Sequence, residues 1–219
     1  LENLAEAYLA AGRPADTIRL WDDLRGAGVL EPGMVHRAAA ALLERGDRPG
    51  AMEALLRCRQ HWPDQAALGP ILERLRALRA RVAFFCGFDD LPAVQDLYEF
   101  VARRFPTRLA DGDRPKETFE LMQWCDIAWF EGCAGGLVQA SRLPKVCRIA
   151  ARLQAAEALG PAAAEVNWAH VDVLAAAGAR PIGPRAGAAG APGPGAVRCL
   201  GYGVNLDRWP FADRPRGAH

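Results

Sequence analysis

Polar side chains follow several short apolar runs of this chain, where they could act together on a ligand. The apolar run 82–86 is followed by Gly87-Phe-Asp-Asp90, and the run 126–130 is followed by Glu131. A further group, Leu153-Gln-Ala-Ala-Glu157, follows a third run. Carboxylates and amides bind the hydroxyls of sugar-like ligands, and a carboxylate can serve as a general base. The competing interpretation is that these carboxylates are solvated or cap the helices that follow them.

The sequence argues against several familiar sites. A Walker phosphate loop needs Gly-Lys before Ser or Thr, and neither Lys116 nor Lys145 has that context. The residues after 82–86 lack the GxGxxG fingerprint of dinucleotide-binding domains. Ser141 lacks the Gly-x-Ser-x-Gly setting of a nucleophile elbow, and the histidines stand apart and predict no metal site. Gly132-Cys-Ala-Gly-Gly136 could bind an anion through its backbone, although a lone glycine-rich turn is a weak signal and close turn packing is the favoured reason for its glycines.

Composition narrows the class of protein. The 219 residues carry 27 basic and 26 acidic side chains, and this formal net charge of +1 argues against a nucleic-acid-binding surface. No uninterrupted apolar stretch reaches the roughly 18 residues that a membrane span needs. The six cysteines form no Cys-x-x-Cys pair, which predicts buried free thiols and a cytoplasmic location. The helical spacing of apolar residues already includes Leu1, the first residue of the chain. We therefore expect the chain to be a fragment of a longer protein.

Residues 1–80 have the apolar periodicity of helices, which Gly and Pro divide into five segments. Similar residues recur 34 positions apart, as in the pairs Gly12 and Gly46, Ala5 and Ala39, and Leu9 and Leu43. The second copy has Gly46, Asp47, Ala51 and Pro63 at its turns and contacts. This period resembles the tetratricopeptide repeat, or TPR, and implies a surface that recruits a protein partner. A generic helical hairpin bundle is the alternative.

From residue 81 the pattern changes to short apolar runs that alternate with helical segments such as 91–104. The runs predicted as strands are 82–86, 107–110, 126–130, 145–150, 172–176 and 196–200. This alternation predicts an α/β fold with βαβ units and an open parallel sheet of Rossmann-like topology. Parallel sheets bind ligands at the carboxyl ends of their strands. We therefore expect Asp89, Glu131, Gln154 and Glu157 on one rim.

Three regions follow from these patterns. They are a TPR-like helical region at 1–80, a Rossmann-like domain at 81–205, and an exit linker and tail at 206–219. Residues 183–196 consist mainly of Gly, Pro and Ala without an apolar period, which predicts a flexible loop inside the second region.

Four segments after residue 81 stand in a characteristic order. They are Leu121-Met-Gln-Trp-Cys-Asp-Ile-Ala-Trp-Phe-Glu131, Lys145-Val-Cys-Arg-Ile149 with 152–157, the stretch 166–174, and Gly203-Val-Asn-Leu-Asp-Arg-Trp-Pro-Phe211. Over about residues 81–215 this order resembles the N-terminal, acceptor-side domain of retaining GT-B glycosyltransferases. The last segment is similar to the family's link into its second domain.

The resemblance implies transfer of a sugar from a nucleotide-sugar donor to a hydroxyl of a sugar, lipid or protein acceptor. Retention at the anomeric carbon without a metal or other cofactor is expected. The implied catalytic residues are Glu157 or Glu131 as a base and Gln154 as a group that orients the acceptor. The implied substrate-binding residues are Gly87, Phe88, Asp89 and Gly132.

The chain also departs from the family pattern. Gln154 stands where the family usually has a histidine, and Gly201-Tyr202 replaces Pro-Asn in the link. The donor-binding second domain would follow His219, so this chain alone is expected to be inactive. A second hypothesis is therefore a non-catalytic TPR interaction or scaffold protein with a degenerate glycosyltransferase-like domain. A third is an unrelated α/β domain, such as a flavodoxin-like or hydrolase fragment.

Overall fold

The computed structural model divides into two compact units, Leu1–Arg79 and Ala80–His219. The residues that it describes are 4–5, 7–8, 11, 13–112, 114–132, 135–153, 160–177 and 197–200. The predicted loop 183–196 and the predicted tail 206–219 lie outside the described residues.

The first unit consists of helices. They are α2 (Pro14–Gly26), α3 (Pro32–Glu44), α4 (Arg48–His61) and α5 (Leu68–Ala77). Each of the first three carries a proline in its first turn, where the missing backbone N–H removes no helical hydrogen bond. The turn between α3 and α4 uses Gly46 at φ +78°, and the Asp47 carboxylate then caps α4 by accepting from the Gly50 N–H at 2.9 Å.

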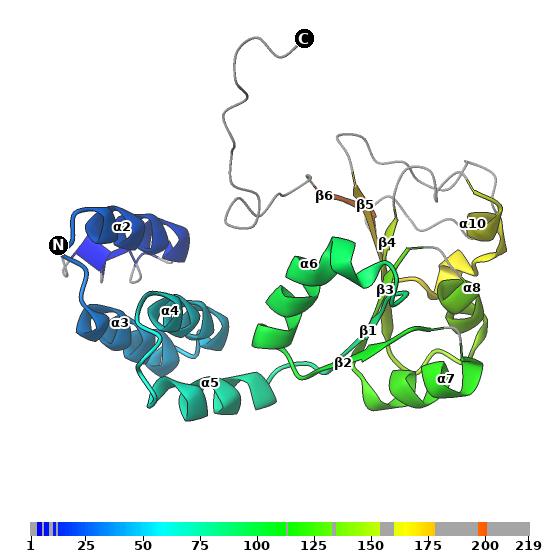
Figure 1. Cartoon of the computed structure of the whole chain (residues 1–219), viewed down its shortest axis with the longest axis horizontal. Coiled ribbons are helices and arrows are strands. Elements are labelled where there is room, and N and C mark those ends of the chain that lie inside the picture. Colours follow the sequence, from blue (N-terminus) through cyan, green and yellow to red (C-terminus); the bar gives the residue numbers. More distant parts are fainter. Residues whose placement is uncertain are drawn as a thin grey trace, which may run out of the picture. The chain divides into compact units, whose positions relative to one another are not determined.

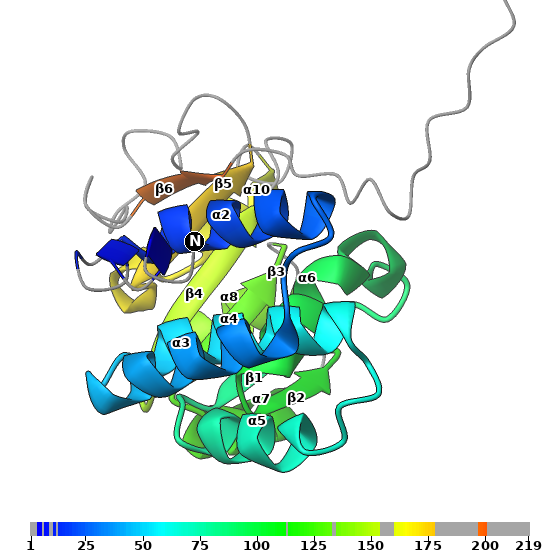
Figure 2. The same cartoon turned by 90° about the vertical axis from the view of Figure 1, so that its left-hand side faces the viewer.

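Some buried positions of this unit recur at the offset of 34 residues noted in the sequence. Helices α3 and α4 lie side by side (Figures 1 and 2). Positions 34 apart in α2 and α4 are buried alike, namely Thr17 and Ala51, Trp21 and Leu55, and Leu24 and Cys58. Arg57 of α4 also donates to Asp22 of α2 at 2.8 Å. The two helices therefore present equivalent faces to one core.

The second unit contains a parallel sheet, as the sequence predicts. Its described strands are β1 (Val82–Phe85), β2 (Thr107–Ala110), β3 (Ile127–Glu131), β4 (Arg148–Leu153), β5 (Val173–Ala177) and β6 (Val197–Leu200). They pair in the order β2-β1-β3-β4-β5-β6, all parallel. The chain moves outward from β1 to β2 and then returns to β3 on the other side. The switch point of this doubly wound sheet, where such folds bind ligands, therefore lies between β1 and β3.

Helices cover both faces of the sheet (Figure 1). Helix α6 (Leu91–Arg104) packs on one face, against Phe84 and Cys86. The other face carries α7 (Pro115–Trp124), α8 (Gly135–Arg142), α10 (Pro161–Glu165) and the 3-10 helix η1 (Trp168–His170). Successive side chains of β1 are buried on opposite faces of the sheet. All residues of the strand are therefore apolar. Within the described part of the chain, no helix is long and apolar enough to cross a membrane.

Strand β4 begins and ends three residues later than the prediction of 145–150. Its ladder with β3 begins where the Arg148 N–H donates to the Asp126 carbonyl at 3.1 Å. The preceding Lys145 is held instead by the side chain of Asp172, at 2.7 Å. The later end brings Arg152 into the strand, directly opposite Glu131 of β3.

Candidate functional site at the carboxyl edge of the sheet

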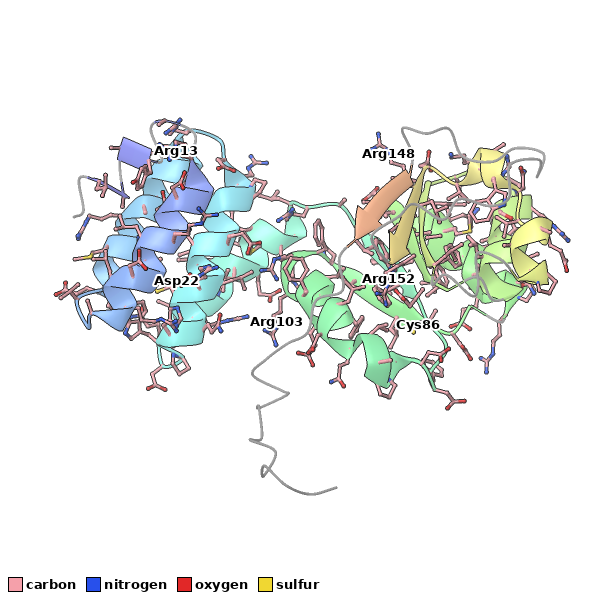
Figure 3. All side chains as sticks on the ribbon, turned by 90° about the horizontal axis from the view of Figure 1, so that it is seen from above. Arg13, Asp22, Cys86, Arg103, Arg148 and Arg152 are labelled. Atoms are coloured by element: carbon pink, nitrogen blue, oxygen red, sulfur yellow. The ribbon has the colours of Figure 1, made fainter. Side chains whose placement is uncertain are left out.

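The carboxyl ends of three neighbouring strands form the candidate site. Gly87 follows β1, Glu131 ends β3, and Arg152 lies opposite Glu131 in β4. Figure 3 shows Cys86 and Arg152 at this end of the sheet, with Arg148 at the opposite end of β4. The sequence predicted that the residues following the strands lie at one edge of the sheet. For the described strands, the structure confirms this prediction.

An ion pair occupies the centre of this edge. Arg152 Nε donates to Glu131 Oε1 at 2.7 Å, and Arg152 Nη2 lies 2.5 Å from the same oxygen. Trp129 Nε1 donates to Glu131 Oε2 at 3.3 Å. The Glu131 side chain is only 8% exposed and that of Arg152 is 23% exposed. The carboxylate is therefore held in one orientation, with Oε1 occupied and Oε2 more weakly bonded.

Cys86 lies buried beside this ion pair. Burial, reinforced by the Glu131 and Asp90 carboxylates, raises the pKa of its thiol to about 11. The thiol also donates to the Gly87 carbonyl at 3.4 Å. At neutral pH it is protonated, so it lines the site as an apolar group and does not act as a nucleophile.

The loop after β1 presents its side chains to solvent. Phe88 is 60% exposed, and Asp89 beside it is exposed as well. Gly87 has little free space, because a Cβ there would lie 3.0 Å from Asp90 Oδ2 and 3.9 Å from Asp111 Oδ1. Asp90 occupies the position before α6 without making a side-chain capping bond. The loops after β1 and β2 therefore bring two carboxylates to this glycine.

The glycines after β3 serve packing. Gly132 adopts φ +89° and donates its N–H to the Arg152 carbonyl at 2.8 Å, which extends the β3–β4 ladder. A Cβ on Gly136 would lie 3.0 Å from the backbone oxygen of Gly112. The first turn of α8 thus lies close against the loop after β2, and the tight-packing interpretation of this turn is supported.

The structure places five of the seven predicted site residues at this edge. They are Gly87, Phe88, Asp89, Glu131 and Gly132. Gln154 and Glu157 lie outside the described residues. Sequence reasoning missed Arg152 and Asp111. Asp111 follows β2 directly, as Asp89 and Asp90 follow β1, so the same rule applied to 107–110 would have found it. Arg152 could be identified as a site residue only from the register of β4 against β3.

The described histidines and cysteines do not form a metal-binding site. No group of three or more His, Cys, Asp or Glu side chains in the described ranges is arranged to hold a metal ion. His36 Nε2 instead lies 3.5 Å from the Cys58 sulfur. Four of the cysteines are free thiols: Cys58, Cys86 and Cys125 are buried, as predicted, and Cys147 is partly buried.

Comparisons with protein families, curated proteins and solved structures found no match to this chain.

Proposed function

We propose that this chain is the acceptor-side half of a retaining glycosyltransferase, which moves a sugar from a nucleotide-sugar to an acceptor hydroxyl. One observation carries the proposal: at the switch point of a parallel sheet, the loop after β1 carries an exposed aromatic ring and exposed carboxylates, and β3 and β4 carry the Glu131–Arg152 ion pair at the same edge. The sheet by itself supports many functions, so the side chains at this edge decide the choice.

The chemistry of the edge suits a hydroxyl-rich ligand. The exposed ring of Phe88 offers an apolar surface to the face of a sugar, and the Asp89 carboxylate beside it accepts hydrogen bonds from hydroxyls. Among the described residues, only Glu131 accepts hydrogen bonds from Arg152. The remaining guanidinium N–H groups would donate to oxygens of the ligand.

Within this proposal, Glu131 or Glu157 takes the proton of the acceptor hydroxyl, and Gln154 orients that hydroxyl. Glu131 would accept the proton at Oε2, the oxygen that Arg152 leaves free. The donor nucleotide would bind to a second domain of the full-length protein, without a metal. The helical unit would act as a TPR-like pair that recruits the acceptor or a partner protein, which its equally buried positions 34 residues apart support.

The test uses the full-length protein that contains this chain. UDP- and GDP-linked hexoses are titrated by calorimetry, and release of nucleoside diphosphate is followed with simple sugars as acceptors. We expect Asp89→Asn and Glu131→Gln to lower turnover by at least about ten-fold while donor affinity stays unchanged. Glu120→Gln, on the exposed side of α7, is the matched control and should leave both quantities unaltered.

A non-catalytic scaffold is the second candidate. The observation that favours it is the bond between Arg152 and Glu131, which occupies the described carboxylate best placed to act as a base. The same experiment separates the two functions. If none of the nucleotide-sugars binds, or if one binds and Glu131→Gln changes no turnover, the scaffold is favoured over the transferase.

A further inference from the structure

Two free cysteines lie close together at the amino edge of the sheet, opposite to the candidate site. Cys125 precedes β3 and Cys147 directly precedes β4. Because Ile127 pairs with Arg148, Cys147 lies opposite Asp126 and one residue along from Cys125. A strand spacing of about 4.8 Å and a rise of about 3.3 Å per residue then place the two Cα atoms about 6 Å apart. This separation is within the range that a disulfide spans.

The two side chains also point into the same core. Both pack in the cluster that lies beneath α7 and α8. Cys125 Sγ donates to the Met122 carbonyl at 3.7 Å. The neighbouring Cys147 thiol lowers the pKa of Cys125 below the ordinary thiol value, and Cys125 in turn raises the pKa of Cys147. Cys125 is only 4% exposed, whereas Cys147 is partly exposed, so a small reagent reaches the pair from the side of Cys147.

We propose that Cys125 and Cys147 are a redox modification site, which forms a reversible disulfide on contact with a small peroxide. One sulfur attacks the O–O bond of hydrogen peroxide, which forms a sulfenic acid and releases one water. The second sulfur then forms the S–S bond as the S–O bond breaks, and another water leaves. Overall, two thiols and one peroxide give one disulfide and two waters. The reaction is independent of the proposed transferase function.

Two other free cysteines lack a partner thiol among the described residues. Cys58 belongs to the helical unit, where it contacts His36. Cys86 lies at the opposite edge of the sheet, and burial raises the pKa of its thiol to about 11. We therefore expect both to react far more slowly than the pair.

Peptide mapping of the full-length protein tests the proposal. The protein is treated with hydrogen peroxide, alkylated under denaturing conditions, and digested with trypsin and a Glu-specific protease. Cleavage after Glu131 separates Cys125, in peptide 121–131, from Cys133, in peptide 132–142. We expect peptide 121–131 joined to peptide 146–148, with two hydrogen atoms fewer than the separate peptides. A thiol reductant should release both peptides, and Cys86 should stay alkylatable throughout.

Variants provide the second measurement. Cys147→Ser, at a partly exposed position, should abolish the joined peptide, whereas Cys58→Ser should leave its yield unchanged. The proposal is overturned by a link from 146–148 to 132–142 instead, by oxidation to sulfinic acid without a disulfide, or by loss of the Cys86 thiol at the same rate as the pair.

Discussion

At the scale of single residues, the Glu131–Arg152 pair shows how strand pairing creates a site that no local sequence pattern predicts. Each residue lies at the end of a strand that is otherwise apolar, and the register places the two opposite each other. With side chains 8% and 23% exposed, neither charge is fully solvated without its partner. Removing one partner therefore costs more than removing both charges.

This asymmetry gives a first prediction. Arg152→Met should lower the free energy of unfolding by about 3 kcal/mol, because it leaves the Glu131 carboxylate poorly solvated. The double variant Glu131→Gln with Arg152→Met should recover at least half of that loss. Urea unfolding of the wild type, the two single variants and the double variant measures both effects. Strict additivity of the two single losses would show that the charges are not coupled.

Asp172 is a second residue whose charge depends on its neighbours. Its Oδ1 accepts from Lys145 Nζ at 2.7 Å and its Oδ2 from the Ile149 N–H at 2.8 Å. Burial raises the pKa of Asp172, but these two bonds outweigh burial and hold the pKa below its ordinary value of 3.8. The stabilisation is therefore present above the unfolded-state pKa and is lost as the pH falls through the folded-state pKa.

Asp172→Asn should accordingly cost about 1–2 kcal/mol at neutral pH. The difference from the wild type should shrink as the pH is lowered below about 4, where the wild-type carboxylate also becomes protonated. Urea unfolding across this pH range measures the difference, with Glu120→Gln as the control for removal of an exposed charge. A difference that stays constant down to the lowest pH contradicts this account.

At the scale of elements, close packing between the loop after β2 and helix α8 shapes the edge of the sheet. Gly112 adopts φ +86°, and its carbonyl accepts from the Thr118 hydroxyl at 3.2 Å. Gly136 then lies against the Gly112 backbone, with no room for a side chain. These backbone contacts position α8 beside the end of β3.

Two neighbouring glycines of α8 provide a matched test. Gly136→Ala should lower stability by about 1–3 kcal/mol, because its Cβ would meet backbone atoms that have little freedom to move. Gly135→Ala, whose Cβ would approach only the end of the Gln139 side chain at 4.0 Å, should instead gain up to about 1 kcal/mol of helix stability. Thermal unfolding compares the two variants, and equal effects would contradict the packing argument.

At the scale of the whole molecule, each unit has its own hydrophobic core. The helical unit buries a cluster that includes Trp21 and Cys58, and the sheet unit buries clusters on both faces of the sheet. Each described core cluster takes all its buried residues from one unit. We therefore expect local unfolding to be confined to the unit in which a core residue is altered.

The reactivity of buried thiols can show whether unfolding is confined to one unit. Trp21→Ala should destabilise the helical unit by about 3–5 kcal/mol and so speed alkylation of Cys58 by about 100-fold or more. Alkylation of Cys86 in the sheet unit should keep its wild-type rate. Both rates follow from mass spectrometry of timed samples under native conditions. A parallel rise at Cys86 would mean that the two units unfold together.

The sequence by itself determined the classes of the elements and most of their positions. Periodicity predicted the helices of the first unit, and continuous apolar runs predicted the strands, with 107–110 matching β2 at both ends. These signals are local, because they report how each segment divides its own side chains between core and solvent. The rule that carboxyl ends meet at one edge also placed Asp89 and Glu131 correctly.

Only the tertiary structure decided the strand order, the later start of β4 and the contacts of the charged residues. Local periodicity is the same whichever neighbour a strand pairs with, so it contains no information on order. Strand register is a further property that local periodicity leaves open. A slip of one residue turns every side chain of a strand to the other face of the sheet. Glu131 therefore meets Arg152 through the pairing of β3 with β4, which is a property of two segments together.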